Sequence, residues 1–415
     1  MTPSSRSSAG LRSLFQPLLQ VLVATALALA LASCGGGGSG DPATADATAI
    51  SGFQASGDNV LAITVDRGTD GSGSFNIPYV TVTVCQPGTE SCQTVDHVLV
   101  DTGSYGLRLA ASALGSALSL PSVVNAAGSG VGECAQFVTG FVWGSVRRAD
   151  VRLAGETAGN LPIQVIADPD PAYATVPNAC LRTGADIGVG SGANGILGVG
   201  MLTHDCGAAC VSSSAPGLYY ACPASGCIGT TLPLASQVAN PVRSFARNNN
   251  GVALELPLVP VGGAATLSGS LIFGIDTQAN NQLGTATVYQ ASNQGNFTTT
   301  YKGVSYTSSF IDSGSNAIFF PDAAIPVCAG GFYCPPTPLT LSAVNTSVAG
   351  VSGTVTFTVE SVASLAPNAA AANVGADLGF ARSFDWGLPF FFGRKVFVAM
   401  SGASTSKGAG PFWAY

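Results

Sequence analysis

The chain contains the tetrapeptide Asp101-Thr102-Gly103-Ser104 and, in its other half, the related tetrapeptide Asp312-Ser313-Gly314-Ser315. Each follows a short run rich in apolar or β-branched residues, His97–Val100 in the first case and Ser309–Ile311 in the second. A strand that ends in Asp-Thr/Ser-Gly-Ser places a carboxylate on a tight turn, where hydroxyls and backbone amides can hold it. Two copies, one in each half, indicate that a duplicated fold brings two carboxylates face to face.

Composition favours a β-rich protein with many loops. Charged residues make up only 9% of the 415 residues, hydrophobic residues make up 47%, and there are 53 glycines. Strands need few charged residues and turns need glycine, so this balance is typical of strands joined by turns. The net charge of −7 excludes a nucleic-acid-binding function, which requires clustered Lys and Arg.

The N-terminus has the pattern of an export signal. Two arginines precede an apolar run, Leu14–Leu31, that leads into Leu31-Ala32-Ser33-Cys34. This ending resembles the bacterial lipobox, so residues 1–33 are predicted to be a lipoprotein signal peptide and Cys34 the lipidated N-terminus. A flexible glycine-rich tether would then follow, to residue 50. The mature protein is expected on the outer side of a bacterial membrane, facing the periplasm or at the outer membrane; a transmembrane helix with an incidental cysteine is the alternative.

The remaining ten cysteines are an even number, which in an exported chain indicates disulfides. Three close pairs could each close a small loop: Cys85/Cys92, Cys222/Cys227 and Cys328/Cys334. Connectivity does not follow from the sequence. Zinc binding is an alternative for one group of residues: His204, Cys206, Cys210, Cys222 and Cys227.

Period-2 alternation, which is typical of half-buried strands, recurs along the chain. It is present in Tyr79–Val84, Ala149–Leu153, Val252–Leu256, Val355–Val359 and Lys395–Val398. Helices are predicted in few places, the best being Leu109–Leu118 and Leu234–Ala246. The fold class is therefore predicted to be mainly β.

An internal repeat appears when the two aspartate turns are aligned. An apolar-apolar-Gly element follows each of them, Ile196-Leu197-Gly198 in the first half and Phe391-Phe392-Gly393 in the second. A stretch rich in Asn and Pro, Asn240–Gly251, lies between the halves. We therefore expect an N-terminal β lobe over residues 51–245 and a C-terminal β lobe over residues 246–415.

Taken in order, these motifs resemble those of the pepsin-like aspartic peptidases. The resemblance covers Asp101–Ser104, Asn194–Val199, Gly269–Asp276, Phe310–Ser315 and Phe390–Phe397. Within that family, the segments Asn-Asn-Gly and Asp-Ser-Gly-Ser-Asn resemble those of a branch of exported bacterial proteins of uncharacterised function. The resemblance implies a bilobal pepsin-like fold, two pseudo-repeated β lobes with a cleft between them.

The resemblance assigns catalysis to Asp101 and Asp312. Two carboxylates ~4 Å apart repel by about 4 kcal/mol at an effective dielectric constant near 20, or roughly three pKa units. They therefore share one proton and titrate together. The ionised partner would activate a water molecule that attacks the peptide carbonyl, and the protonated partner would bond the carbonyl oxygen. This chemistry is expected to need no metal and no cofactor.

The other residues of the two turns are expected to support this pair. The glycines let the backbone approach the carboxylates closely and donate its amides to them. The serine at the fourth position of each turn donates to the outer carboxylate oxygen. The hydroxyl at the second position links the two turns beneath the carboxyl pair. The supporting residues are Thr102, Gly103, Ser104, Ser313, Gly314 and Ser315.

Two positions depart from the family pattern. The segment expected to form the flap over the substrate, Glu133–Gly144, lacks the usual tyrosine. Phe137 or Trp143 could cover the cleft instead, although each is equally typical of a core residue. Arg394, after Gly393, stands where the family usually has aspartate.

The predicted function is that of a monomeric, membrane-anchored aspartic endopeptidase acting on peptide or protein substrates. The alternative is a catalytically inactive pepsin-like lipoprotein that serves as a binding or envelope scaffold protein, which the altered flap and the Cys-rich segment Thr203–Gly229 favour; a plain β adhesin is a weaker third. A serine or cysteine hydrolase is disfavoured because only two histidines exist. His97 is predicted to be a strand residue with a satisfied ring. The glycine cluster Gly188–Gly192 lacks the Lys-Ser/Thr ending of a phosphate-binding loop.

Overall fold

The computed structural model describes residues 55–415, apart from 191, 366–367, 378 and 380. The predicted signal peptide, Cys34 and the tether lie outside the described residues. Across the part of the chain that is described, no helix has the length and apolar character needed to cross a membrane.

The described residues are mainly β, as the alternating pattern predicts. The strands up to residue 250 are β1 (Val60–Val65), β2 (Pro78–Cys85), β3 (Cys92–Asp101), β4 (Tyr105–Ala110), β5 (Val131–Phe137), β6 (Gly140–Leu153), β7 (Glu156–Ile166), β8 (Ala185–Asp186), β9 (Gly195–Val199), β10 (Tyr219–Ala221) and β11 (Ile228–Gly229). The later strands are β12 (Gly251–Leu256), β13 (Leu267–Phe273), β14 (Val288–Gln290), β15 (Phe297–Tyr301), β16 (Val304–Ile311), β17 (Ile318–Phe319), β18 (Leu339–Thr346), β19 (Ser352–Val359), β20 (Gly375–Ala376), β21 (Asp385–Trp386), β22 (Arg394–Ala399), β23 (Ser404–Thr405), β24 (Gly408–Ala409) and β25 (Phe412–Ala414).

Helices are short throughout the described residues. The α-helices are α1 (Asn178–Leu181), α2 (Ala208–Ser212) and α3 (Val362–Leu365). The 3₁₀ turns are η1 (Ala111–Ala113), η2 (Pro171–Tyr173), η3 (Leu234–Ser236), η4 (Pro241–Ser244), η5 (Ala279–Asn281), η6 (Ala329–Gly331) and η7 (Leu388–Phe390).

Both helix predictions are wrong. Leu109 belongs to β4, which lies between β7 and β9, and the residues that follow it form only the 3₁₀ turn η1. The second predicted helix divides into η3 and η4. Pro241, the first residue of η4, lies inside the predicted helix, where a proline removes a backbone donor and interrupts the helix.

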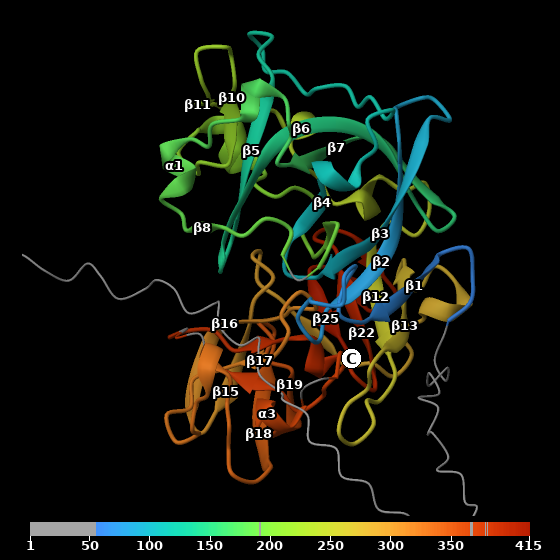
Figure 1. Cartoon of the computed structure of the whole chain (residues 1–415). Coiled ribbons are helices and arrows are strands. Elements are labelled where there is room, and N and C mark those ends of the chain that lie inside the picture. The colour runs from blue at the N-terminus through green and yellow to red at the C-terminus, as the bar shows by residue number, and fades with distance from the viewer. Residues whose placement is uncertain (1–54, 191, 366–367, 378, 380) are drawn as a thin grey trace, which may run out of the picture. The chain divides into compact units, whose positions relative to one another are not determined.

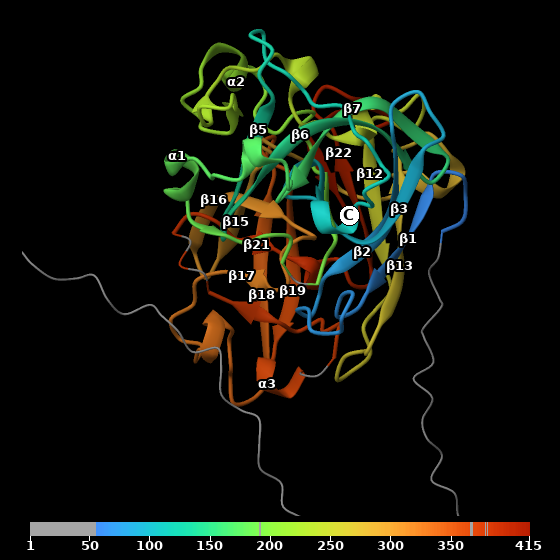
Figure 2. The ribbon, with the colours of Figure 1, turned by 45° about the horizontal axis from the view of Figure 1, so that its top comes forward.

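Two large sheets contain most of these strands, and β23 pairs with β24 in a separate two-stranded sheet. The larger has the order β11-β10-β5-β6-β7-β4-β9-β3-β2-β1-β13-β12-β22-β25-β14, and a seven-stranded sheet has the order β19-β18-β15-β16-β21-β17-β20. The strands β5–β7 and the strands β15–β19 lie in different halves of the view in Figure 1. The first β lobe joins the second through β1, which pairs antiparallel with β13 (Figure 2).

A repeated strand pattern surrounds each aspartate turn. In the first lobe, β3 runs parallel to β9, β9 antiparallel to β4, and β4 parallel to β7. In the second lobe, β16, β21, β17 and β20 repeat these three relationships in the same order. The two-lobed β architecture predicted from the sequence is therefore present.

The second partner segment of the repeat was predicted incorrectly. Ile196-Leu197-Gly198 lies beside β3, as expected, but the corresponding segment beside β16 is Asp385-Trp386-Gly387, not Phe391-Phe392-Gly393. The pattern is misleading because the true segment begins with an acidic residue, while apolar residues follow it in η7.

Alternation on β21 explains how that acidic residue is positioned. Phe384 and Trp386 pack together in the aromatic core, with ring centroids 4.6 Å apart. Trp386 Nε1 donates to Asn345 Oδ1 at 3.1 Å. Because successive side chains of a strand point to opposite faces, Asp385 projects away from that core.

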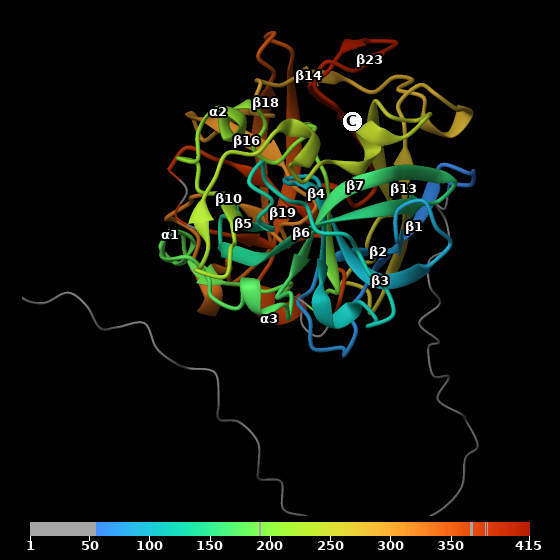
Figure 3. The same cartoon turned by 90° about the horizontal axis from the view of Figure 1, so that it is seen from above.

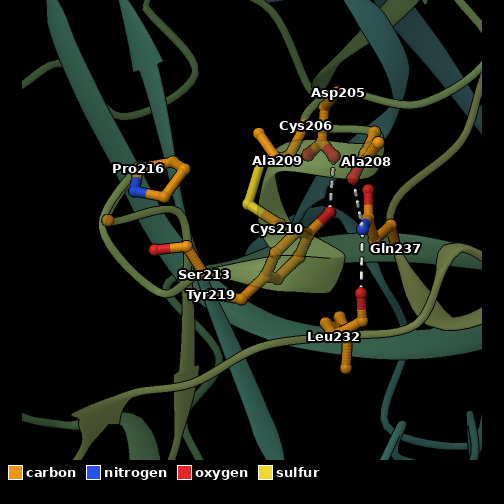
Figure 4. Close-up of a disulfide and its surroundings, with 12 residues drawn as sticks. Asp205, Cys206, Ala208, Ala209, Cys210, Ser213, Pro216, Tyr219, Leu232 and Gln237 are labelled. Atoms are coloured by element: carbon orange, nitrogen blue, oxygen red, sulfur yellow. Dashed lines mark hydrogen bonds between the residues drawn. A yellow bond between two sulfur atoms is a disulfide. The ribbon is translucent and has the colours of Figure 1, made fainter.

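Five disulfides connect the ten cysteines of the described residues. The three close pairs predicted from the sequence are formed. The other two disulfides are Cys134–Cys180 and Cys206–Cys210, the latter drawn in Figure 4 beside Asp205 and Tyr219. All four cysteines of the zinc alternative are therefore oxidised, and the described residues hold no group of three or more His, Cys, Asp or Glu arranged for a metal ion.

Candidate functional site

The two aspartate turns lie against each other and are joined by reciprocal hydrogen bonds. The Thr102 amide donates to Ser313 Oγ at 3.1 Å, and the Ser313 amide donates to Thr102 Oγ1 at 2.9 Å. Each hydroxyl also donates to a carbonyl at the end of the opposite strand, Thr102 to Ile311 at 3.0 Å and Ser313 to Val100 at 2.7 Å. Both side chains are fully buried, so these four bonds fix the turns relative to each other.

Each carboxylate is held in the same way by its own turn. Asp101 accepts the Gly103 amide on Oδ1 at 2.7 Å and the Ser104 hydroxyl on Oδ2 at 2.5 Å. Asp312 follows the same pattern: the amide two residues on donates to Oδ1 at 2.8 Å, and the Ser315 hydroxyl donates to Oδ2 at 2.8 Å. These contacts orient both carboxyl groups.

Glycine in each turn permits the close approach of the opposite carboxyl group. A Cβ on Gly103 would lie 2.9 Å from Cγ of Asp312, and a Cβ on Gly314 would lie 2.9 Å from Oδ1 of Asp101. Burial, together with the charges of Asp101 and Asp385 and a hydrogen bond from Asp101, raises the pKa of Asp312 well above its usual value. This is the behaviour expected of two carboxyls that share a proton.

A third carboxyl belongs to this cluster. Ser315 Oγ lies 2.7 Å from Oδ2 of Asp385 as well as 2.8 Å from Oδ2 of Asp312. Asp385 is only 2% exposed, and burial raises its pKa well above the usual value, with a further contribution from Asp101. Asp385 is not recognisable from the sequence, because no local pattern distinguishes it from any acidic residue in a loop.

The aspartates lie in a cleft of about 500 Å³. Its apolar lining comes from both lobes and consists of Ile77, Leu99, Phe137, Val138, Ile187, Val189, Ile196, Phe310 and Phe319. No Lys, Arg or His is among the lining residues, so all the charge in the cleft is on carboxyls. The cleft can therefore accept apolar groups beside the two carboxyls.

A hairpin of β5 and β6 lies over one side of the cleft, in the segment where the sequence predicts a flap. Its tip supplies Gln136, Phe137, Val138 and Thr139 to the lining. Trp143, the other flap candidate, lies instead in the hydrophobic core: it is 4% exposed and its Nε1 donates to the Tyr173 carbonyl at 2.8 Å. Only the first of the two candidates therefore reaches the cleft.

This hairpin is held along both edges. On one side, β5 pairs with β10; on the other, β6 pairs with β8 at Gly140 and Phe141. The Cys134–Cys180 disulfide connects β5 to α1, which lies on the same side of the molecule in Figure 3. The hairpin is thus anchored to its neighbours close to its tip.

His97 has the structural role that the sequence predicts. Its Nδ1 lies 3.1 Å from a carboxylate oxygen of Asp96, and its Nε2 lies 3.3 Å from one of Asp66. Both ring nitrogens are therefore engaged, and the residue is not among those lining the cleft.

The fold and the site together define a mainly β protein of two lobes with a pair of aspartate turns in the cleft. The sequence matches, over residues 55–415, the family described as "Protein of unknown function (DUF3443)", and the chain belongs to that family. Among solved structures, it is similar to the aspartic proteinase from Irpex lacteus, with 16% identity, a TM-score of 0.48, and coverage of 86% of this chain and 96% of that chain. No curated protein matches the sequence.

Proposed function

We propose that this protein is an aspartic endopeptidase that hydrolyses peptide bonds with Asp101, Asp312 and a water molecule held between them. The observation that carries the proposal is the reciprocal bonding of Thr102 and Ser313 beneath the carboxyl pair. Two buried carboxyls held together are costly to fold. A cleft that only bound a ligand would not need them.

In this mechanism, one aspartate is ionised and the other is protonated. The ionised carboxylate accepts a proton from the water as the water attacks the substrate carbonyl, and the protonated carboxyl hydrogen-bonds the carbonyl oxygen. The Ser104 and Ser315 hydroxyls and the Gly103 and Gly314 amides hold the carboxyls in position throughout. The apolar lining would accept apolar side chains on either side of the bond that is cleaved.

The proposal includes export and membrane attachment. The five disulfides are typical of an oxidising compartment. Lipidation at Cys34 would hold the protein, as a monomer, on the outer side of a bacterial membrane, where it would meet peptide or protein substrates.

The anchored hairpin favours a second function, that of a binding or scaffold protein. Opening the hairpin would require breaking its pairing with β8 and β10 or distorting the segment fixed by the Cys134–Cys180 disulfide. A lid that moves little suits a cleft that retains one ligand better than a cleft that turns over many substrates.

A cleavage assay separates the two functions. The oxidised chain is incubated with a mixed peptide library between pH 3 and pH 7, with and without pepstatin. Asp312→Asn is the inactive variant, and Asp70→Asn, at an exposed site, is the matched control. Cleavage that is lost in Asp312→Asn but kept in Asp70→Asn supports the endopeptidase. Cleavage that survives in Asp312→Asn contradicts it, and no cleavage at any pH favours the binding protein.

A further inference from the structure

Ser315 stands between two carboxyl groups and can donate a proton to only one of them. Its Oγ lies 2.8 Å from Oδ2 of Asp312 and 2.7 Å from Oδ2 of Asp385, both hydrogen-bond distances. A serine hydroxyl carries a single proton, and an ionised carboxylate carries none. In one of these two bonds the serine is therefore the acceptor, and the carboxyl on that side must be protonated.

The surroundings of Asp385 indicate that it is the protonated partner. It is 2% exposed, and its Oδ1 is buried without a hydrogen-bond partner among the residues that the structure describes. An unpaired anionic oxygen in such a place is much more costly than the carbonyl oxygen of a neutral acid. Asp312, in contrast, has an amide donor on Oδ1.

No positive charge acts on Asp385 from the elements packed against it. Its register partners on the two flanking strands are Phe310 on β16 and Phe319 on β17. The charged groups that face it are Asp312, through Ser315, and Asp101, whose charge raises the pKa of Asp385 further. The Ser315 hydrogen bond by itself lowers the pKa of Asp385, but burial outweighs it and Asp101 adds to the effect of burial, so these surroundings favour the neutral acid.

The first lobe lacks this arrangement. The residue in the place of Asp385 is Ile196, which pairs with Leu99 as Asp385 pairs with Phe310. An isoleucine cannot form a hydrogen bond with Ser104. The Ser104 hydroxyl, which donates to Asp101, therefore has no carboxyl partner at the position that Asp385 occupies in the second lobe. The two halves of the carboxyl pair are thus chemically different.

We propose that Asp385 is a positioning residue that, as a neutral acid, donates to Ser315 and thereby directs the Ser315 hydroxyl onto Oδ2 of Asp312. The role of Asp385 in the reaction rests on the proposed endopeptidase function. With Ser315 directed in this way, Oδ2 of Asp312 remains an acceptor, and the proton shared by the catalytic pair is kept off that atom. Ionisation of Asp385 would draw the serine proton away and place a second negative charge beside Asp312.

Two substitutions at one position test the kinetic consequence. Asp385→Asn keeps a donor to Ser315, whereas Asp385→Ile copies the first lobe and removes it. At the pH of maximal cleavage, we expect Asp385→Asn to keep kcat within about threefold of the original protein. We expect Asp385→Ile to lower kcat by about tenfold or more with little change in KM, because the Ser315 hydroxyl is then no longer directed onto Asp312. Equal kcat values for the two variants would overturn the proposal.

A second measurement does not depend on activity. Because the pKa of Asp385 is raised in the folded state, its contribution to stability is present below the unfolded pKa of about 4 and is lost as pH rises through the folded pKa. Asp385→Asn should therefore gain stability relative to the original protein as pH rises above about 4, as measured by urea unfolding. If the stability of the original protein and that of Asp385→Asn change with pH in parallel, Asp385 is not protonated in the folded state above its unfolded pKa. That result would overturn the proposal.

The two measurements keep the failures apart. If the original protein cleaves nothing, the endopeptidase proposal fails, and the stability curves alone decide whether Asp385 is a neutral acid. If Asp385→Ile does not fold, Ser315→Ala is combined with Asp385→Asn. If the effects of the two changes on the free energy of unfolding are not additive, they support the proposed link between Asp385 and Ser315. Additive effects contradict it.

Discussion

The hydroxyls of Thr102 and Ser313 each accept a hydrogen bond from the backbone amide of the other residue, although the two are far apart in the sequence. The distance is 3.1 Å to Ser313 Oγ and 2.9 Å to Thr102 Oγ1. Each hydroxyl also donates to a carbonyl of the opposite strand. The pair therefore joins the two lobes directly under the carboxyl groups. Its geometry determines how close Asp101 and Asp312 come to each other.

Replacing Thr102 by valine keeps the shape of the side chain but removes its hydroxyl. The Ser313 amide and the Ile311 carbonyl would each lose a bond in a buried place, so we expect a loss of about 2 kcal/mol or more in the free energy of unfolding. Urea unfolding measures the loss. Thr285→Val, at an exposed loop position, should change stability by no more than about 0.5 kcal/mol. Similar effects of the two substitutions would contradict the role assigned to Thr102.

Arg108 lies in a buried charge network in the first lobe. Its Nη2 is 2.8 Å from Oε1 of Glu133 and 3.2 Å from Oδ2 of Asp205, and all three side chains are buried. Arg108→Leu would leave two carboxyls without their cation, and we expect it to cost about 3–5 kcal/mol. Arg152→Leu breaks an exposed pair with Glu90 and should cost at most about 1 kcal/mol. Comparable losses in urea unfolding would show that the buried network is not structural.

The same network should make stability depend on pH. Burial and the charge of Glu133 raise the pKa of Asp205 well above its usual value, although Arg108 and Tyr219 act in the opposite direction. The folded state then binds a proton more tightly than the unfolded state. Stability from this group is greatest below an unfolded pKa of about 4 and falls as pH rises through the folded pKa.

Asp205→Asn removes this titration while keeping an acceptor for the Tyr219 hydroxyl, which bonds Asp205 at 2.5 Å. Relative to the original protein, the variant should therefore become more stable as the pH rises from about 4 to about 8. Thermal unfolding across that range provides the test. If the stability of Asp205→Asn relative to the original protein stays constant or falls as pH rises, Asp205 ionises in the folded state without loss of stability. That result would contradict the prediction.

The disulfides should contribute unequally to stability. Cys134–Cys180 spans 46 residues of sequence and Cys85–Cys92 spans 7. Removing a crosslink across a longer loop frees more unfolded conformations, within a typical range of about 2–4 kcal/mol. Cys134→Ala with Cys180→Ala should therefore lower stability more than Cys85→Ala with Cys92→Ala. It should also expose the hairpin tip to limited proteolysis at residues 137–139, and equal resistance of the two variants would contradict this role.

Phe137 and Trp143 should separate a function in the cleft from a function in the core. Phe137→Ala removes an apolar group from the cleft lining and should raise KM, or weaken pepstatin binding, with little change in stability. Trp143→Phe loses the indole bond to Tyr173 and should cost about 1 kcal/mol in unfolding free energy, with KM unchanged. The reverse pattern would mean that the hairpin tip does not contact the ligand.

The parts of the site that could be predicted from sequence are those encoded within a few residues. Asp101 and Asp312 are recognisable because each ends a β-branched or apolar strand and is followed at once by the glycine and serine that hold it. The close spacing of Cys85 and Cys92 indicated that they could close a small loop, and the structure contains that disulfide. Periodicity failed for Leu109, because β4 is a short strand buried on both faces, where even the charged Arg108 is buried.

Contacts between distant segments could not be read in this way. Asp385 looks like any acidic residue in a loop until β21 pairs with β16 and turns its side chain toward Ser315. The Cys134–Cys180 disulfide likewise depends on the hairpin lying beside α1.

The sequence by itself determined the β class, the two turns and the residue types that hold each carboxyl, because these depend on local backbone geometry and short-range hydrogen bonds. The tertiary structure decided that the turns interlock through Thr102 and Ser313, that the hairpin is anchored on both edges, and that a third carboxyl stands behind Ser315. The physical reason is that burial and long-range strand pairing set the protonation of a carboxyl, and neither is a property of its sequence neighbours.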